Sequence, residues 1–235
     1  MADAVWYNGR MPRTARIAPG GLVYHVLNRT NGRTTLFRKD GDYQAFIELL
    51  AESQQRVPMR MLGFCLMPNH WHLVLWPRED GELSAFMRWL SNTHVRRYHQ
   101  HYHSYGRGHV YQGRFKSFPI QDDAHLWAVL RYVEANPLRA QLVTRSQDWK
   151  WSSLCCKRSP ETKKDLLSDW PVDRPDGWTR LVNAPLNEAV LKSVQTCAQR
   201  SRPFGDAGWS LSIAARLGLQ FTLNPRGRPR KVRKT

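Results

Sequence analysis

Two short apolar segments separated by a turn constrain the fold of this chain more than any other feature. Residues 61–67 read MLGFCLM and residues 70–76 read HWHLVLW, with Pro68 and Asn69 between them. Apolar runs of this length are typical of strands, and Pro and Asn are typical of a tight turn. The pattern therefore predicts a hairpin around which the rest of the chain is organised.

The second strand of this hairpin begins with two histidines, His70 and His72, on either side of Trp71. Side chains alternate between the faces of a strand, so the histidines share one face and the tryptophan points to the other. Two imidazoles on one face can bind one divalent metal ion without rearranging the backbone. Ordinary half-buried histidines produce the same pattern, so the pair alone leaves both interpretations open.

The charge balance of the chain indicates a polyanionic partner. Among 235 residues, 36 Lys and Arg stand against 19 Asp and Glu, which gives a formal net charge of +17. No apolar run could span a bilayer, so nucleic acid is favoured over a membrane. The chain opens without a signal-peptide pattern, and we expect a cytoplasmic, nucleoid-associated protein. The four cysteines lack C-x-x-C spacing, so neither a zinc knuckle nor a disulfide framework is expected.

Several further motifs accompany the hairpin. Residues 24–29 read YHVLNR, residues 112–117 QGRFKS, residues 131–140 RYVEANPLRA and residues 149–153 WKWSS. Together with MPNHWHL at 67–73, they resemble in sequence and order the REP-associated tyrosine transposases, a branch of the single-tyrosine HUH (IS200-like) transposases. Several motifs in the right order are far more specific than one alone. Tyr111 departs from the family, which usually has Trp at this position.

The resemblance implies an α+β fold with a ferredoxin-like antiparallel sheet flanked by helices, the HUH endonuclease core. The sequence agrees, because apolar residues at helical spacing predict helices over residues 40–56, 82–100 and 122–136 between the predicted strands. We expect Asp40 or Asp42 to cap the first of these helices and Asp122 to cap the third.

The predicted organisation has five parts. Residues 1–19 form a flexible basic arm, residues 20–156 the transposase domain, residues 157–183 a variable loop or linker, residues 184–224 a helical C-terminal extension, and residues 225–235 a basic disordered tail.

The resemblance also implies the site residues. Tyr132 stands in RYVEANP where the family has its nucleophile, and His70, His72 and Asn136 would hold a divalent metal ion. Oxygen donors beside two imidazoles suit Mg²⁺ or Mn²⁺ better than a closed zinc site. At helical spacing, Tyr132 lies on the flank of the apolar stripe with Asn136 one turn further along. We expect His25 to pack against or support this group without binding the metal.

DNA contacts are expected from basic residues in the domain and in the tail. These residues are Arg29, Arg114 and Lys116 in the domain, and Arg226, Arg228, Arg230 and Lys231 in the tail, which resembles a minor-groove AT-hook. Residues 99–114 mix Tyr, His, Arg and Gly, a composition that suits stacked bases and phosphates. An ordinary exposed hairpin would have a similar composition.

The function implied by the resemblance is a metal-dependent endonuclease and transposase. It would cleave and rejoin single-stranded DNA beside a REP-type hairpin through a 5′-phosphotyrosine. The alternative is a catalytically silent protein that binds structured DNA or RNA on the same fold, and a metal-dependent RNase is a weaker third option. The joint presence of both histidines, Tyr132 and Asn136 favours the enzyme. Monomer and dimer both stay open.

Overall fold

The computed structural model describes residues 17–155 and 166–224, and its centre is a four-stranded antiparallel sheet. The strands are β1 (Val23–Arg29), β2 (Arg60–Met67), β3 (His70–Trp76) and β4 (Lys116–Ile120), arranged in the order β2-β3-β1-β4. Helix α1 (Asp40–Arg56) connects β1 to β2, and α2 (Glu82–His101) connects β3 to β4. This order of elements and strands is the predicted ferredoxin-like arrangement, and β2 and β3 form the predicted hairpin.

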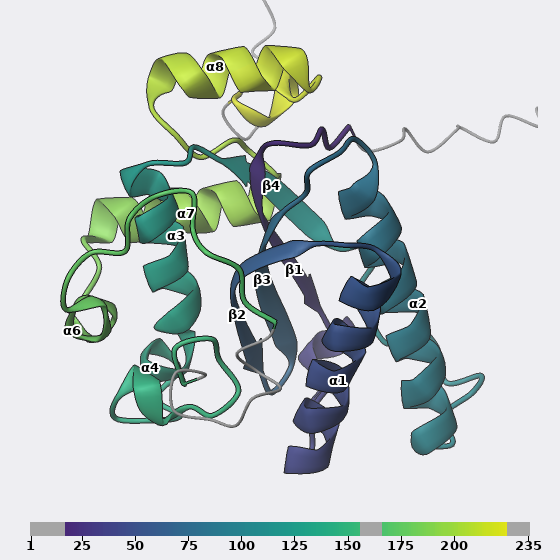
Figure 1. Ribbon diagram of the computed structural model, residues 1–235. Helices are drawn as coiled ribbons and strands as arrows, with labels where there is room; N and C mark the ends of the chain where they lie inside the picture. Colours follow the sequence, from purple (N-terminus) through teal and green to yellow (C-terminus); the bar gives the residue numbers. More distant parts are fainter. Residues whose placement is uncertain (1–16, 156–165, 225–235) are drawn as a thin grey trace, which may run out of the picture.

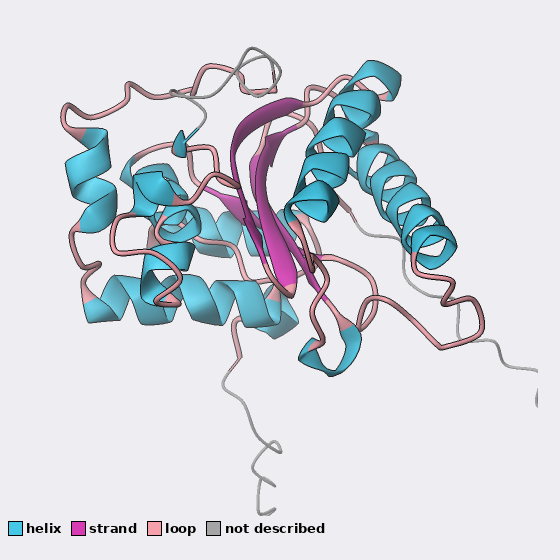
Figure 2. Ribbon diagram, turned by 90° about the horizontal axis from the view of Figure 1, so that it is seen from below, coloured by secondary structure: helices cyan, strands magenta, loops and turns pink. Residues whose placement is uncertain are grey.

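Helices cover both faces of the sheet (Figures 1 and 2). Helices α1 and α2 lie on one face, and α3 (Ala124–Glu134) and α7 (Glu188–Arg200) lie on the other. The alternation of side chains along β3 divides the core accordingly. Trp71 and Leu73 pack in the cluster under α1 and α2, whereas Val74 packs in the cluster under α3 and α7. A strand that is buried on both faces reads as an almost continuous apolar run, as β2 and β3 do.

The segment predicted as a linker is partly folded against the domain. It contains α6 (Trp178–Asn183), and the buried Trp178 donates a hydrogen bond from Nε1 to a carboxylate oxygen of Glu134 at 2.7 Å. Trp170 donates from Nε1 to the carbonyl oxygen of Leu62 at 2.8 Å. The prediction that residues 157–183 are only a loop or linker is therefore wrong for the part that the structure describes, because its tryptophans find buried partners on β2 and α3.

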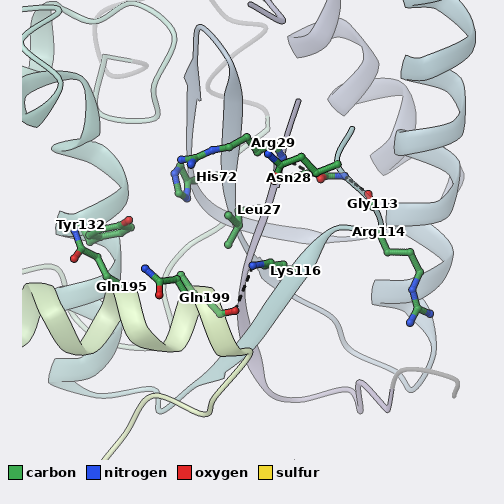
Figure 3. A pocket seen from close by; sticks show the side chains of 12 residues that line it. Leu27, Asn28, Arg29, His72, Gly113, Arg114, Lys116, Tyr132, Gln195 and Gln199 are labelled. Atoms are coloured by element: carbon green, nitrogen blue, oxygen red, sulfur yellow. Dashed lines mark hydrogen bonds between the residues drawn. The ribbon is translucent and has the colours of Figure 1, made fainter. Parts of the chain in front are cut away.

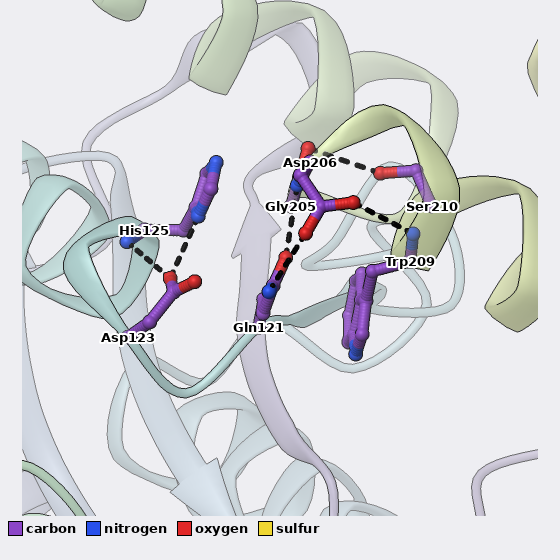
Figure 4. Close-up of polar contacts among 7 residues, drawn as sticks. All are labelled: Gln121, Asp123, His125, Gly205, Asp206, Trp209 and Ser210. Atoms are coloured by element: carbon purple, nitrogen blue, oxygen red, sulfur yellow. Dashed lines mark hydrogen bonds and ion pairs between the residues drawn. The ribbon is translucent and has the colours of Figure 1, made fainter.

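The end of the extension is tied to the end of β4. Phe204 forms a parallel bridge with Ile120, and α8 (Ala207–Arg216) begins just beyond it. Gln121 donates to the carboxylate of Asp206 at 3.0 Å, and its side-chain oxygen accepts from the backbone N–H of Asp206 at 2.9 Å (Figure 4). The pairing requires glycine at Gly205, because a Cβ there would lie 2.5 Å from the Gln121 side chain. The C-terminal extension is thus fastened to the domain.

The N-caps of two helices differ from the sequence predictions. The N-cap of α1 is Lys39, and Asp42 instead accepts hydrogen bonds from the backbone N–H groups of Arg38 and Lys39. The N-cap of α3 is Asp123 and not Asp122, because its carboxylate accepts from the N–H of His125. Either aspartate suits a cap, so composition could not choose between them.

Helix α3 ends at Glu134, two residues before the predicted end. Asn136 instead begins the short helix α4 (Asn136–Arg139). Pro137 explains the break, because it has no N–H to donate to the preceding turn and disfavours helical geometry at the residue before it.

Three parts of the sequence lie outside the described residues: 1–16 of the predicted basic arm, residues 156–165, and the whole predicted tail, 225–235. Within the two described ranges, no helix combines the length and apolar character needed to cross a bilayer.

The contact between α3 and β2 generates a stability prediction. A Cβ at Gly63 would lie 2.7 Å from Cδ2 of the buried Leu130. We expect Gly63→Ala to lower the free energy of unfolding by about 1–3 kcal/mol, because overpacking forces neighbouring groups apart. Urea denaturation measures the change. The control is Gly41→Ala in α1, where a Cβ meets no atom within 4 Å and helix propensity favours alanine. Equal stability of the two variants would contradict this account.

Candidate active site

The histidines of β3 lie on the face of the sheet that α3 covers. The rings of His70 and His72 have centroids 4.9 Å apart, and their planes are nearly perpendicular. Trp71 points to the opposite face, where it is fully buried and donates a hydrogen bond to the Tyr111 hydroxyl at 2.9 Å. The alternation along β3 thus places both imidazoles on one side, as the sequence predicts.

His25 of β1 supports this pair from the neighbouring strand. Its Nε2 and Nδ1 of His72 are 2.8 Å apart and share a hydrogen bond. Both side chains are buried, with His25 at 0% and His72 at 3% exposed. Burial lowers the pKa of His25 to about 3 and that of His70 to about 4, and it holds the pKa of His72 well below 6.5. The three imidazoles are therefore neutral at physiological pH.

Tyr132 projects from α3 toward the same group of rings. Its ring centroid lies 5.8 Å from that of His72 and 6.2 Å from that of His25, with near-perpendicular planes. The side chain is 9% exposed, and burial raises the pKa of its hydroxyl. The nearby guanidinium groups of Arg139 and Arg29 act in the opposite direction, since a positive charge favours the phenolate.

Arg139, which the sequence analysis did not select, joins Tyr132 to Asn136. Its guanidinium carbon lies 4.4 Å from the centroid of the Tyr132 ring. It donates hydrogen bonds to the Tyr132 carbonyl oxygen at 2.7 Å and to the side-chain oxygen of Asn136 at 2.6 Å. Its place in the RYVEANPLRA motif, one turn after Asn136, was the available signal, since α4 brings residues three apart together.

Two atoms at this site fit a divalent metal ion. His70 Nδ1 lies 2.6 Å from the side-chain oxygen of Asn69, which can only accept, so the lone pair of His70 is on Nε2. His72 Nε2 is buried without a hydrogen-bond partner among the described residues. When His72 donates its Nδ1 proton to His25, this Nε2 also carries a lone pair.

The third expected ligand, Asn136, is less available. Its side-chain oxygen accepts from Arg139, and its amide nitrogen is buried without a partner in the described part of the chain. The described residues contain no group of three or more His, Cys, Asp or Glu arranged for metal binding. A metal ion here would therefore depend on the two histidines, an amide oxygen shared with a guanidinium, and water or substrate oxygens.

A cavity of about 560 Å³ opens in front of His72 and Tyr132 (Figure 3). Arg29, Arg114 and Lys116, the three DNA-contact residues predicted in the domain, all line it, and none of its lining residues is acidic. The four predicted tail residues, Arg226, Arg228, Arg230 and Lys231, lie outside the described residues. The cavity thus combines a buried tyrosine with a cationic wall, which suits a phosphodiester.

One wall of the cavity comes from α7, in the C-terminal extension. Gln195 and Gln199, one helical turn apart, both line it, and Lys116 donates a hydrogen bond to the Gln199 carbonyl oxygen at 3.3 Å. The sequence predicts a helical extension over residues 184–224 but not where its helices dock. Sequence reasoning therefore missed both glutamines.

The comparisons with known proteins identify the family of the domain that carries this site. Residues 20–136 match the family model described as transposase IS200-like. The chain carries a domain of the IS200-like transposase family.

Two relatives of this transposase domain are informative. A Haemophilus influenzae protein, provisionally named a REP-associated tyrosine transposase, is 25% identical over 146 residues, which cover 57% of this chain and 80% of that protein. A solved structure of a REP-associated tyrosine transposase bound to a REP hairpin aligns with a TM-score of 0.51 and 20% identity, covering 70% of this chain and 93% of that one. The structural similarity shows a shared fold. The family recognised from the motifs is confirmed.

The position of Arg139 generates a prediction for the Tyr132 hydroxyl. Arg139→Gln removes a positive charge that favours the phenolate, so the pKa of Tyr132 should rise further above its ordinary value of 10.0. Carbon-13 NMR of labelled tyrosine rings measures the titration, and the signal missing from Tyr132→Phe identifies the residue. Arg145→Gln is the control, because that exposed arginine pairs with Asp148. An unchanged Tyr132 pKa in Arg139→Gln would show that the charge has no influence.

Proposed function

We propose that this transposase domain cleaves and rejoins single-stranded DNA next to a REP-type hairpin, with Tyr132 as the nucleophile. The observation that carries the proposal is the position of Tyr132, whose ring packs edge-on against His72 beside a cavity lined by cations and by no acidic residue. The family membership supports a DNA-processing reaction, and the relative bound to a REP hairpin supports the choice of substrate.

The proposed reaction transfers a phosphoryl group to the protein. The Tyr132 oxygen attacks the scissile phosphorus, the bond to the 3′-oxygen breaks, the phenol loses its proton and the 3′-oxygen gains one. The product is a 5′-phosphotyrosine and a free 3′-hydroxyl. Because the covalent bond conserves the energy of the phosphodiester, attack by a 3′-hydroxyl reverses the step without ATP.

The surrounding cations would assist the attack in two ways. Arg139 lies against the Tyr132 ring and lowers the pKa of a hydroxyl that burial otherwise raises. Arg29 and Lys116 line the cavity where the phosphate would lie and can neutralise its charge, which is the main electrostatic barrier to attack on an anion.

We further propose that His70 and His72 hold Mg²⁺ or Mn²⁺, with Asn136 as an additional oxygen ligand. When bound, such an ion would polarise the phosphodiester and offset the charge that develops on its oxygens. His25 keeps the His72 ring in place through the Nε2–Nδ1 hydrogen bond.

The nucleophile is tested by Tyr132→Phe, which removes one oxygen and keeps the buried ring. We expect normal folding and hairpin binding, at least a 1,000-fold loss of cleavage as an order of magnitude, and no SDS-resistant adduct. Tyr105→Phe is the matched control, because Tyr105 is 64% exposed and lies outside the cavity. Mass spectrometry of the trapped wild-type adduct should find the nucleotide on the peptide containing Tyr132. A wild-type protein that binds the hairpin without any cleavage would favour the catalytically silent alternative.

The metal ligands are tested by binding as well as by activity. His70→Ala and His72→Ala should each abolish Mn²⁺ binding in calorimetry and cleavage in gels, while hairpin affinity falls little, because affinity rests mainly on phosphate contacts. His101→Ala, on the exposed end of α2, is the control. Tight Mn²⁺ binding by His72→Ala would exclude this site.

The pH dependence of Mn²⁺ binding follows from the same histidines. Protons compete with the metal only below the histidine pKa, which burial lowers to about 4 for His70. We therefore expect constant affinity between pH 8 and pH 6, with loss only as the pH falls toward 4. A steep loss near 6.5, the ordinary histidine value, would show that the pair is solvent-exposed in solution.

A further inference from the structure

A second cavity joins the candidate active site. It has a volume of about 680 Å³ and lies between α2 and residues 108–115. The two cavities share four lining residues, which are Asn28, Gln112, Gly113 and Arg114. Asn28 donates a hydrogen bond from Nδ2 to the Gly113 carbonyl oxygen at 3.3 Å, which fixes the segment between the cavities to β1 (Figure 3).

A third, smaller cavity of about 200 Å³ continues the path. It shares His99, Gly108, His109 and Val110 with the second cavity. The three cavities therefore follow one another along the connection between α2 and β4, from Tyr132 to the end of α2. We call the three together the α2 track.

The charge of the α2 track is uniform. Arginines line each part of it, including Arg88 and Arg114 in the second cavity and Arg107 in the third, and no aspartate or glutamate lines any part. By contrast, Asp42 lines the cavity between α1 and α2, and Asp176 lines the one beside α6. Arg88, Arg107 and Arg114 make no ion pair with a described residue. Their charges are thus available to a polyanion.

The walls of the second cavity favour an unstacked base over a duplex. Val95 and, at the edge of the core, Val110 give it apolar surface, and the exposed Asn92 adds a carboxamide. Behind this wall, the buried Ser91 Oγ has no hydrogen-bond partner among the described residues. A duplex keeps its bases stacked and offers mainly phosphates, whereas a single strand offers flat apolar faces and free polar edges.

We propose that the second cavity is a base-binding subsite for single-stranded DNA that continues from the scissile phosphate along the α2 track. This inference rests on the proposed function, because it takes the cavity at Tyr132 as the place of the scissile phosphate. Asn92 would contact a base edge, since a carboxamide offers a donor and an acceptor side by side. Arg88 and Arg114 would contact the backbone of the same strand.

The test compares two REP-type DNA hairpins, one blunt and one with single-stranded flanks on both sides. Affinities are measured in EDTA, so that cleavage does not interfere. The full-length double variant Arg88→Ala/Asn92→Ala should bind the flanked hairpin about tenfold more weakly than wild type and the blunt hairpin equally well. Both substituted side chains are exposed, so folding should be preserved, and the retained binding of the blunt hairpin reports on it.

The control variant is Arg96→Ala/Gln100→Ala, on the same helix and with the same change of charge. Both residues are exposed and neither lines the α2 track, so we expect equal affinity for both hairpins. Bromouracil in the flank should cross-link to wild-type peptides from residues 87–95 or 108–115. Equal weakening of both hairpins by Arg88→Ala/Asn92→Ala would mean that the cavity contacts the duplex, and it would overturn the proposal. Unchanged affinity for the flanked hairpin would also overturn it.

The outcome can be separated from that of the proposed function. If wild type cleaves DNA through Tyr132 but Arg88→Ala/Asn92→Ala binds the flanked hairpin as tightly as wild type does, the subsite is refuted and the nuclease function stands. If the double variant loses affinity only for the flanked hairpin and wild type forms no covalent adduct with DNA, the subsite is supported and the nuclease function is refuted. Failure of the wild-type protein to bind either hairpin would refute both.

Discussion

A hydrogen bond between two buried histidines joins the central strands of the sheet, and the candidate site is built around it. His25 and His72 lie where neither ring can be charged at low cost, because burial penalises the imidazolium form. One hydrogen bond joins the two rings, and Phe118 and Tyr132 cover them with aromatic surface, whereas His25 Nδ1 and His72 Nε2 have no partner among the described residues.

The position of Tyr132 depends on α3, and α3 is held from both of its sides. Gly63 allows Leu130 to approach β2 closely, and the buried Glu134 accepts hydrogen bonds from Ser153 and Trp178. A buried carboxylate needs such partners, and here they come from segments that follow the family-matched region. The proposed nucleophile is thus held on the fold by residues from the sheet and by Ser153 and Trp178 together.

Much of the fold could be predicted from the sequence, because its strongest signals are local. The apolar runs of the hairpin and the helical spacing of residues 40–56 give the bounds of these elements to within one residue. The convergence of Tyr132 with the histidines could not be read from spacing, since it depends on how α3 packs against the sheet. That expectation came from the resemblance to the family.

The features that were missed at the site and in the linker depend on how segments pack in the folded protein. Arg139 contacts the Tyr132 ring from α4, which follows the interruption of α3. Gln195 and Gln199 reach the cavity because α7 docks beside β4. The linker prediction failed because it was based on the Pro and charged residues of this segment. It did not take into account Trp170 and Trp178, which donate hydrogen bonds to β2 and α3. Local patterns do not record such long-range contacts.

The wall that α7 contributes has an evolutionary consequence. The residues that match the transposase family end at 136, whereas α7 begins at Glu188. The chemistry and part of the wall that a substrate meets are therefore encoded in separate stretches of the gene. Mutations in the later stretch can change which strands fit the cavity while the tyrosine and the histidines stay the same. Lineages that share one reaction can in this way diverge in the DNA they act on.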